Sequence, residues 1–357
     1  MKGIVLWILC VTLSASVWAE TGSAPTLKSA YQAYQDAISA KDYKAALAAA
    51  RETYTIGTTE LPPDHKNIPP LTFNYGRMLA KNGLNDDAYG MLKRALDAYE
   101  SSYGNDSSEL IDPLMELGII ETKRDRPFGM YFDRALKIAR SSAAPNDELV
   151  AKLDLEIGMA LANARQRADI DHFDDALAGF TRCCGADDPR AALANFYIGK
   201  HYLQLSDAAK ARDAFEAALP IFEKHHASLN VVQTHAFLAD VYSQLGNDAA
   251  TIEHSRAVGL IEPQTDMQRA LPLIRRNPSY PVAAQRAGRT GWVQIEMTID
   301  TDGRVVDPKV VDAENGDDFA EPALVAIRQW RYAPRFVDGK PVDTPGVRVV
   351  LTFDLDD

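Results

Sequence analysis

The neighbouring cysteines Cys183 and Cys184 are the only thiols beyond residue 20 of the 357-residue chain. If the chain is exported, an oxidising compartment permits a disulfide between them. Adjacent residues close only a strained ring, however, and Cys183 follows Phe180 by three residues, where the repeat described below has a small packed side chain. We therefore predict packed free thiols, with a vicinal disulfide or a metal-binding role as the alternatives.

The histidines form a second set of residues with possible chemistry. His225, His226, His235 and His254 lie within 30 residues of one another. Imidazole is a common zinc ligand, but these spacings match no ligand pattern such as His-Glu-x-x-His. The sequence therefore predicts solvated histidines on helices and no metal site.

The segment Asp300-Thr301-Asp302-Gly303 resembles the start of a calcium loop. Arg304 stands where the next acidic ligand is needed, and no glutamate follows in register, so a hairpin turn is the better interpretation. The chain also lacks a Gly-x-Ser-x-Gly nucleophile motif, a phosphate-binding loop and a dinucleotide fingerprint. We expect no enzymatic activity and no cofactor.

The net charge of the chain excludes some classes of binding partner. Lys and Arg total 38 against 50 Asp and Glu, which gives a net charge of −12. A basic footprint for nucleic acid is therefore absent, and anionic membrane surfaces would be repelled. Hydrophobic residues make up 46% of the chain and charged residues 25%, as in ordinary folded proteins.

The N-terminus has the layout of a secretory signal peptide. Lys2 supplies a positive charge, residues 4–18 are almost wholly apolar, and Val17 and Ala19 provide small residues before a cleavage site. The apolar run of 15 residues would span about 22 Å as a helix, less than the bilayer core of about 30 Å. We predict cleavage after Ala19 and a periplasmic protein that contacts membranes only through its partners.

A small residue recurs about every 40 residues between positions 25 and 263. Its copies are Gly76, Gly118, Gly158, Gly199 and Ala239, and a small residue in such a frame lets two helices approach closely. Each is followed by a second segment with a small residue and a bulky one four positions later, such as Ala88 and Leu92, Ala176 and Phe180, and Ala211 and Phe215. The pattern predicts about six helical hairpins stacked in a solenoid.

These units resemble tetratricopeptide (TPR) repeats, in a longer form than the usual 34 residues. The resemblance is clearest around Gly76, Gly158, Gly199 and Ala239, and weaker around Gly118, where Arg126-Pro127 precedes the second helix. It implies a scaffold that binds an unknown protein or peptide on a concave surface and has no chemistry of its own.

The pattern changes after Pro263. Val293, Ile295, Met297 and Ile299 alternate with polar residues, which indicates a strand with one buried face. A second strand follows over 305–311, then a helix with Phe319, Ala323, Ile327 and Trp330 on one face, and a last alternating strand from Val347. With a short helix at the start, the order is α-β-β-α-β, a small α+β domain.

Several motifs of this segment occur in a characteristic order. They are Arg276-Asn277-Pro278-Ser279-Tyr280-Pro281, Ala287-Gly288, Gly291-Trp292-Val293, Asp302-Gly303-Arg304-Val305 and Trp330-Arg331-Tyr332-Ala333-Pro334. Together they resemble the C-terminal domain of the TonB family of periplasmic energy transducers. The resemblance covers about 80 residues, and the expected domains are a signal peptide at 1–19, repeats at 25–263, a linker at 264–276 and the terminal domain at 277–357.

The resemblance implies that the domain binds an extended peptide of an outer-membrane transporter by adding it to the last strand. The residues placed at this site are Asn277, Ser279, Tyr280, Val347, Arg348, Val349, Val350, Leu351, Thr352 and Phe353. For Trp330 and Tyr332 we favour a role in the core. Edge strands are usually shielded, so an unused last strand is the alternative to the peptide site.

The chain departs from the family in two ways. Residues 1–19 contain no histidine and look cleavable, whereas family transducers keep an anchor helix with a functional histidine. The long proline-rich spacer is also missing, and the helical repeats could replace it. Two hypotheses follow: a periplasmic TonB-like protein that binds transporter peptides and supports energy-coupled transport, or an envelope scaffold without energy transduction.

Overall fold

The computed structural model describes residues 25–124, 126–141, 147–164, 170–261 and 270–355. The predicted signal peptide, residues 1–19, lies outside these ranges. Contacts within the chain divide it into two compact units, Met1–Asn105 and Asp106–Asp357, and each is described by itself. No helix in the described ranges is long and apolar enough to span a membrane.

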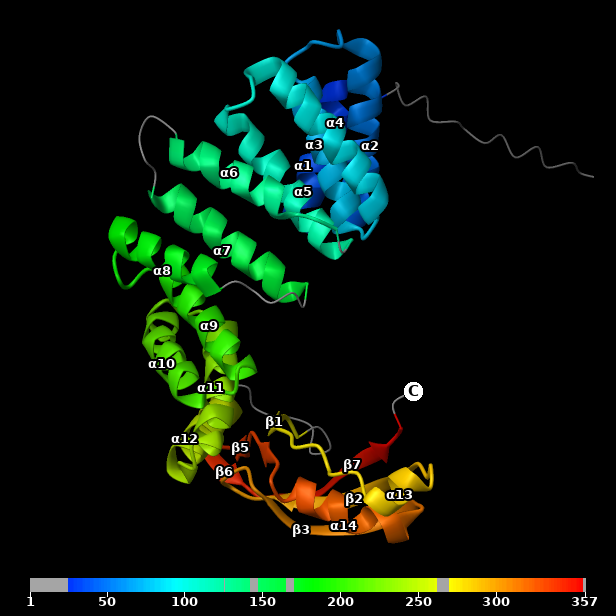
Figure 1. Ribbon diagram of the computed structural model, residues 1–357, viewed down its shortest axis with the longest axis vertical. Coiled ribbons are helices and arrows are strands. Elements are labelled where there is room, and N and C mark those ends of the chain that lie inside the picture. Colours follow the sequence, from blue (N-terminus) through cyan, green and yellow to red (C-terminus); the bar gives the residue numbers. More distant parts are fainter. Residues whose placement is uncertain (1–24, 125, 142–146, 165–169, 262–269, 356–357) are drawn as a thin grey trace, which may run out of the picture. The chain divides into compact units, whose positions relative to one another are not determined.

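The first unit consists of two helix pairs (Figure 1). Its helices are α1 (Leu27–Ser39), α2 (Tyr43–Glu60), α3 (Ile68–Lys81) and α4 (Asn85–Tyr103). Side-chain caps fix the starts of α1 and α2: Thr26 accepts from the N–H of Ser29, and Asp42 accepts from the N–H of Ala45. Small and apolar side chains fill the space between the helices, namely Tyr34, Ala46, Ala49, Ala50 and Met78.

The second unit begins with four more helix pairs. After a short 3-10 turn at Ser108–Leu110, they are α5 (Ile111–Lys123) with α6 (Gly129–Ser141), α7 (Asp147–Asn163) with α8 (Ile170–Cys184), α9 (Pro189–Gln204) with α10 (Ala208–Lys224), and α11 (Ser228–Gln244) with α12 (Asp248–Ile261). The described residues thus contain six helix pairs, and the predicted TPR-like solenoid of helical hairpins is confirmed.

The recurring glycines let the two helices of a pair approach closely, as predicted. A Cβ atom on Gly158 would lie 2.7 Å from the ring of Phe173, and one on Gly199 would lie 2.7 Å from the ring of Phe215. The same rings stack on the next repeat: Phe173 on Tyr197 and Phe215 on Phe237, each with centroids 5.2 Å apart. Each phenylalanine ring therefore packs against the glycine of its own helix pair and also contacts the first helix of the next pair.

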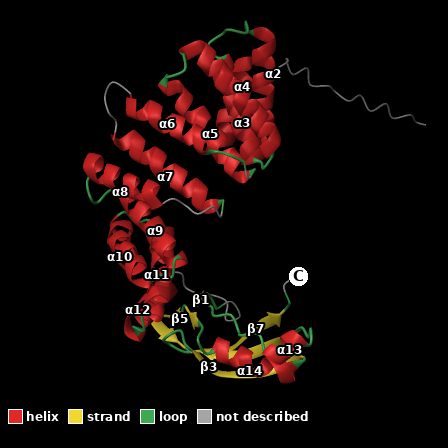
Figure 2. Ribbon diagram, viewed as in Figure 1, coloured by secondary structure: helices red, strands yellow, loops and turns green. Residues whose placement is uncertain are grey.

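The terminal segment is an α+β domain (Figure 2). Its elements are β1 (Pro272–Ile274), α13 (Val282–Arg286), β2 (Gly291–Ile299), β3 (Val305–Glu314), α14 (Gly316–Ile327), β4 (Arg331–Tyr332), β5 (Arg335–Val337), β6 (Lys340–Val342) and β7 (Thr344–Phe353). The main sheet is antiparallel with the order β3-β2-β7, and α14 packs on β2 and β3. The predicted order of helix, two strands, helix and strand is confirmed.

Four short strands, β1, β4, β5 and β6, were not predicted from the sequence. β1 pairs with β4, and β5 pairs with β6. Each has only two or three residues, too few to show an alternating pattern. β1 lies inside the predicted linker 264–276. Trp330 follows the end of α14 rather than lying on it, yet it is buried with Phe319, Ala323 and Ile327 as expected.

Candidate functional site

The last strand lies at an edge of the main sheet. Among the described strands, β7 pairs with β2 alone, from Gly291 opposite Phe353 to Ile299 opposite Thr344. In an antiparallel pair, every second residue directs its N–H and C=O away from the partner strand. Half of the main-chain polar groups of β7 therefore face outward, where an added strand would find its hydrogen-bond partners.

The side chains of β7 alternate between the two faces of the sheet. Val347, Leu351 and Phe353 are buried in the domain core, with Val349 packed against it. Arg348, Val350 and Thr352 lie on the exposed face, where Val350 is 53% exposed. Arg348 forms an ion pair with Glu296 of β2, with 2.6 Å between the guanidinium and the carboxylate. The candidate site on β7 is therefore a main-chain edge flanked by exposed side chains, of which Arg348 is held by an ion pair.

The other edge of the sheet, β3, is shielded. Asp307 has a positive φ of 49°, Pro308 lacks an N–H, and Lys309 is exposed. The pairing of β2 with β3 also shifts register twice, whereas β2 and β7 pair without a shift from Gly291 to Met297. Bulges, prolines and lysines are the devices that block strand addition, and β7 carries none of them over Val347–Phe353.

The segment that precedes α13 reaches the end of β7 through one residue. The ring of Tyr280 lies edge-on to Phe353, with centroids 5.9 Å apart, and its hydroxyl donates to the carbonyl of Arg289 at 2.6 Å. Asn277 and Ser279 are exposed. Among the predicted site residues, Tyr280 is thus the one with a ring contact to β7.

Trp330 and Tyr332 belong to the core, as favoured. They are 5% and 1% exposed, and Trp330 Nε1 donates to the carbonyl of Arg276 at 2.9 Å. Burial raises the pKa of the Tyr332 hydroxyl to about 12. These two side chains are therefore part of the domain core.

The turn at Asp300 is the predicted hairpin. One carboxylate oxygen of Asp300 accepts from the N–H groups of Asp302 and Arg304, both at 2.8 Å, and Gly303 has a φ of 78°. This Asp300 oxygen is therefore engaged by the turn itself.

The prediction for the cysteines is wrong. The Sγ atoms of Cys183 and Cys184 are joined in a disulfide, and both side chains are exposed. The reason lies in the length of α8, which ends at Cys184 and is followed by Gly185 with a φ of 96°. The pair therefore lies on the outside of the last turn, where Arg190 donates to Cys184 at 3.4 Å.

The prediction of solvated histidines on helices is right only about exposure for His225 and His226, which lie in the turn after α10, and it is wrong for the buried His235. His235 on α11 is 8% exposed, and its Nδ1 lies 2.8 Å from Nδ1 of the half-buried His254 on α12. Burial lowers the pKa of both rings. Within the described ranges, no group of three or more His, Cys, Asp or Glu side chains could hold a metal ion.

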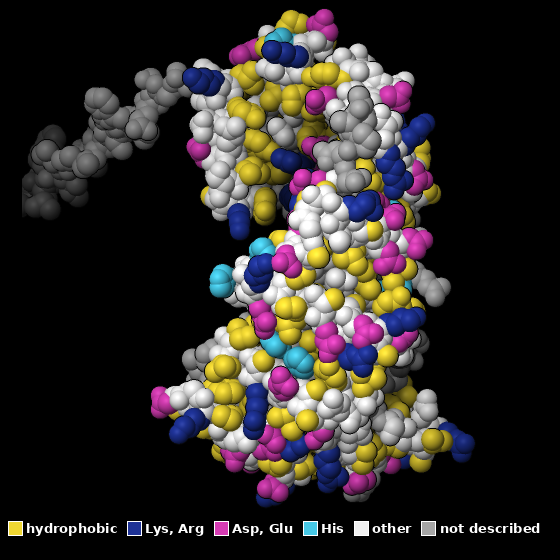
Figure 3. All heavy atoms as spheres, turned by 90° about the vertical axis from the view of Figure 1, so that its left-hand side faces the viewer, with side chains coloured by type: hydrophobic (Ala, Val, Ile, Leu, Met, Phe, Trp, Pro, Cys, Tyr) yellow, Lys and Arg dark blue, Asp and Glu magenta, His cyan; other side chains and the backbone are white. Residues whose placement is uncertain are grey.

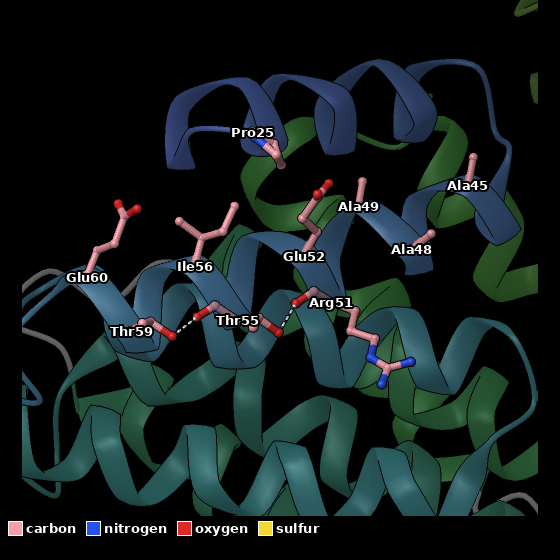
Figure 4. A pocket seen from close by; sticks show the side chains of 10 residues that line it. All are labelled: Pro25, Ala45, Ala48, Ala49, Arg51, Glu52, Thr55, Ile56, Thr59 and Glu60. Carbon is pink, nitrogen blue, oxygen red and sulfur yellow. Dashed lines mark hydrogen bonds between the residues drawn. The ribbon is translucent and has the colours of Figure 1, made fainter. Parts of the chain in front are cut away.

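A shallow hollow on the first repeat offers little chemistry (Figure 4). It is lined by Pro25 and residues of α2, namely Ala45, Ala48, Ala49, Arg51, Glu52, Thr55, Ile56, Thr59 and Glu60. The hydroxyls of Thr55 and Thr59 donate to the carbonyls of Arg51 and Thr55, one turn earlier. These hydroxyls are therefore engaged by their own helix.

Sequence reasoning missed the residues of the last helix pair that contact the terminal domain. Arg256 and Asp240 form ion pairs with Asp302 and Arg276, and Gly259 lies against Pro334. Gly259, a glycine inside an otherwise helical segment, was the one signal of this contact in the sequence.

On the face of the molecule drawn in Figure 3, basic and acidic side chains are intermingled.

The comparisons with known proteins concern the two parts separately. The family model described as "Gram-negative bacterial TonB protein C-terminal" matches residues 276–355. Protein TonB of Vibrio cholerae serotype O1 is 32% identical over 87 residues, which cover 24% of this chain and 35% of that protein. Protein TonB of Escherichia coli K12 is 35% identical over 83 residues, covering 23% of this chain and 32% of that protein. The chain therefore spans about a third of the length of these curated relatives.

Two solved structures align with parts of this chain. BtubC from P. vanneervenii aligns with 71% of this chain and 98% of its own, with a TM-score of 0.49 and 18% identity. The TonB2 protein from Vibrio anguillarum aligns with 27% of this chain and 90% of its own, with a TM-score of 0.21 and 38% identity. Residues 276–355 are a TonB C-terminal domain, which this chain carries after a series of TPR-like helix pairs.

Proposed function

We propose that this chain is a periplasmic TonB-like protein whose terminal domain binds an extended peptide of a TonB-dependent outer-membrane transporter and thereby supports energy-coupled transport. The peptide adds as a strand to the free edge of β7, and the helix pairs act as a spacer or as a binding surface for another protein. The observation that carries the proposal is that β7 is an unshielded edge strand, whereas β3 is shielded.

In this binding mode, the main chain of β7 supplies affinity and its side chains supply selectivity. Outward N–H and C=O groups of Val347–Phe353 supply affinity, because no strand in the described part of the chain pairs with them on that side. Arg348, Val350 and Thr352 flank the added strand on the exposed face and contribute selectivity. Tyr280 closes the end of the site beside Phe353, and Asn277 and Ser279, exposed in the same segment, offer polar groups to the peptide.

Backbone N-methylation of the peptide tests strand addition directly. Synthetic peptides copying the N-terminal plug segments of such transporters are titrated into the full chain, followed by calorimetry. Methylating the N–H groups of one alternate set of residues should abolish binding, while methylating the other set should leave it nearly unchanged, because only one set faces β7. Equal effects of both sets would exclude strand addition, and absence of binding by every plug-segment peptide would exclude the proposal.

Proline substitutions in β7 provide the reciprocal test. Arg348→Pro, Val349→Pro and Val350→Pro are compared, because adjacent N–H groups point in opposite directions. Variants whose lost N–H faced outward should fold with an unchanged β2–β7 pairing and lose peptide binding. Those whose lost N–H faced β2 should unfold the terminal domain at lower temperature.

The second candidate is an envelope scaffold with no role in energy transduction. It is favoured by the contacts of the terminal domain with α11 and α12, since such a domain could serve to cap the last repeat. The peptide titration separates the two, because a pure cap has no reason to bind plug-segment peptides. Sequencing the mature N-terminus tests export: a start at Glu20 supports cleavage after Ala19.

A further inference from the structure

The last helix pair and the terminal domain meet at a surface where two backbones touch. A Cβ atom on Gly259 of α12 would lie 2.1 Å from the carbonyl oxygen of Pro334 and 3.2 Å from the ring of Phe336. An approach this close leaves no room for any side chain at position 259. The terminal domain can therefore adopt this position only because residue 259 is a glycine.

An apolar cluster extends the contact. Val232 of α11, Val258 of α12 and Ala333 of the terminal domain are buried together, and Leu271 and Leu273 pack against them. Ala333 also donates its N–H to the carbonyl of Leu271 at 2.9 Å. The terminal domain thus contacts α11 and α12 through β1 with its neighbouring residue Leu271, and through Ala333, which follows β4.

Ion pairs surround the apolar cluster on one side. Arg256 of α12 contacts Asp302 at 2.6 Å and donates to the carbonyl of Thr301 at 3.2 Å. Asp248, at the start of α12, pairs with Arg304 and lies 3.6 Å from Arg331. The hydrogen bond from Arg304 is the main cause that lowers the pKa of the Asp248 carboxyl. The β2–β3 turn is thereby attached to α12.

The remaining ion pair connects α11 with the candidate peptide site. Asp240 accepts from Arg276 at 2.7 Å, and the carbonyl of Arg276 accepts from Trp330 Nε1 at 2.9 Å. Arg276 is thus held from both ends, by the repeats through its side chain and by the domain core through its main chain. Asn277, the first residue of the candidate peptide-binding segment, follows it directly.

We propose that α11 and α12 form a docking platform that positions the segment 276–281 for peptide binding, with Asp240 as the positioning residue. This inference rests on the proposed function and deepens it: the last repeat does not touch the peptide but holds the segment that does. The alternative is a docked domain whose peptide affinity is independent of the platform.

Gly259→Ala in the full chain tests the platform. Alanine favours helix, so α12 itself is not weakened, while its Cβ collides with the carbonyl of Pro334. The matched control is Gly90→Ala in α4, where a Cβ would meet no atom within 4 Å. Two readouts are needed: amide hydrogen exchange over residues 271–276, which reports docking, and affinity for the plug-segment peptides described above.

Gly259→Ala should speed exchange over 271–276 and weaken peptide binding about tenfold, while Gly90→Ala changes neither. Asp240→Ala should weaken binding about threefold, and the exchanged pair Asp240→Arg with Arg276→Asp should restore it, which a general loss of packing would not do. Faster exchange with unchanged affinity would overturn the positioning role. Unchanged exchange in Gly259→Ala would overturn the docking itself. If the wild-type chain binds no peptide, the proposed function fails and the coupling fails with it, while the exchange data still report the docking.

Discussion

The Nδ1 atoms of His235 and His254 lie 2.8 Å apart, across the contact between α11 and α12. Two nitrogens at this distance share one proton, since two N–H groups would face each other. Glu216 and Glu223 of α10, Glu253 of α12 and Tyr242 of α11 surround the pair. Burial outweighs these carboxylates, so the pKa of both rings is lowered from its ordinary value of 6.5.

The histidine pair should make the last helix pair sensitive to acid. Because the folded-state pKa values are lowered, the stabilising contribution is complete above pH 6.5 and is lost as the pH falls through the folded-state values. The slope is about 1.4 kcal/mol per pH unit for each proton taken up on unfolding. Urea unfolding followed by circular dichroism at several pH values measures it.

Replacement of His254 by phenylalanine should reduce this slope by about one proton, because the ring that stacks on Tyr242 is kept while the titrating group is removed. A slope equal to wild type in His254→Phe would contradict the assignment.

Replacing a repeat glycine by alanine should lower the free energy of unfolding more, the less space there is beside that glycine. Gly118→Ala, Gly158→Ala and Gly199→Ala place a methyl group 2.3 to 2.7 Å from a phenylalanine ring, and each should lose about 1–3 kcal/mol of unfolding free energy. Gly76→Ala, 3.0 Å from Leu92, should lose less. Thermal denaturation measures the order.

A paired substitution distinguishes the collision from a general effect of alanine. Gly158→Ala combined with Phe173→Leu should recover part of the loss, since the smaller side chain leaves room for the new methyl group. Gly90→Ala, with no neighbour within 4 Å, should be stabilising by about 0.5–1 kcal/mol. A destabilised Gly90→Ala would count against this explanation.

The cysteine pair should behave as a surface disulfide. The mature chain should have a mass two hydrogens below that of the dithiol, and iodoacetamide should modify Cys183 and Cys184 only after reduction. The double variant Cys183→Ser with Cys184→Ser should change stability by less than about 0.5 kcal/mol, because both side chains are exposed. Alkylation without a reductant would show that the thiols are free.

The β2–β3 turn should depend on the Asp300 carboxylate. Asp300→Ala leaves two N–H groups without their acceptor and should cost about 1–3 kcal/mol. Asp300→Asn keeps an acceptor oxygen and should cost less. Tryptophan fluorescence follows the terminal domain, since Trp292 and Trp330 are the tryptophans beyond residue 20. Asp343→Ala at an exposed position serves as the control.

The elements that could be predicted from the sequence are those marked by a recurring residue or by an alternating hydrophobic pattern. Gly158 and Gly199 recur with the repeat and fill their expected role in close helix packing, and Val293–Ile299 alternates as a strand does. The edge position of β7 follows from the family resemblance, and the structure adds that β3 is the shielded edge.

Pairings between distant single residues could not be predicted. Asp240 and Arg276, 36 residues apart, meet only because α11 lies against the terminal domain, and neither residue carries a local signal. His235 and His254 face each other because of the way two helices are rotated, which a single polar residue in each does not reveal. The exposure of the cysteines was missed because the repeat pattern does not show that α8 ends at Cys184.

The contact at Gly259 limits how such a chain can be lengthened or recombined. Gly259 lies twelve residues after Asn247, whose side chain accepts from the N–H of Ala250 at the start of α12. The residue at the same distance from Asp207, the cap of α10, is Leu219. A hairpin copied from α9–α10 into the final place would put a leucine against the carbonyl of Pro334. Repeats can therefore be inserted or deleted upstream, but the last hairpin and the terminal domain must be inherited together.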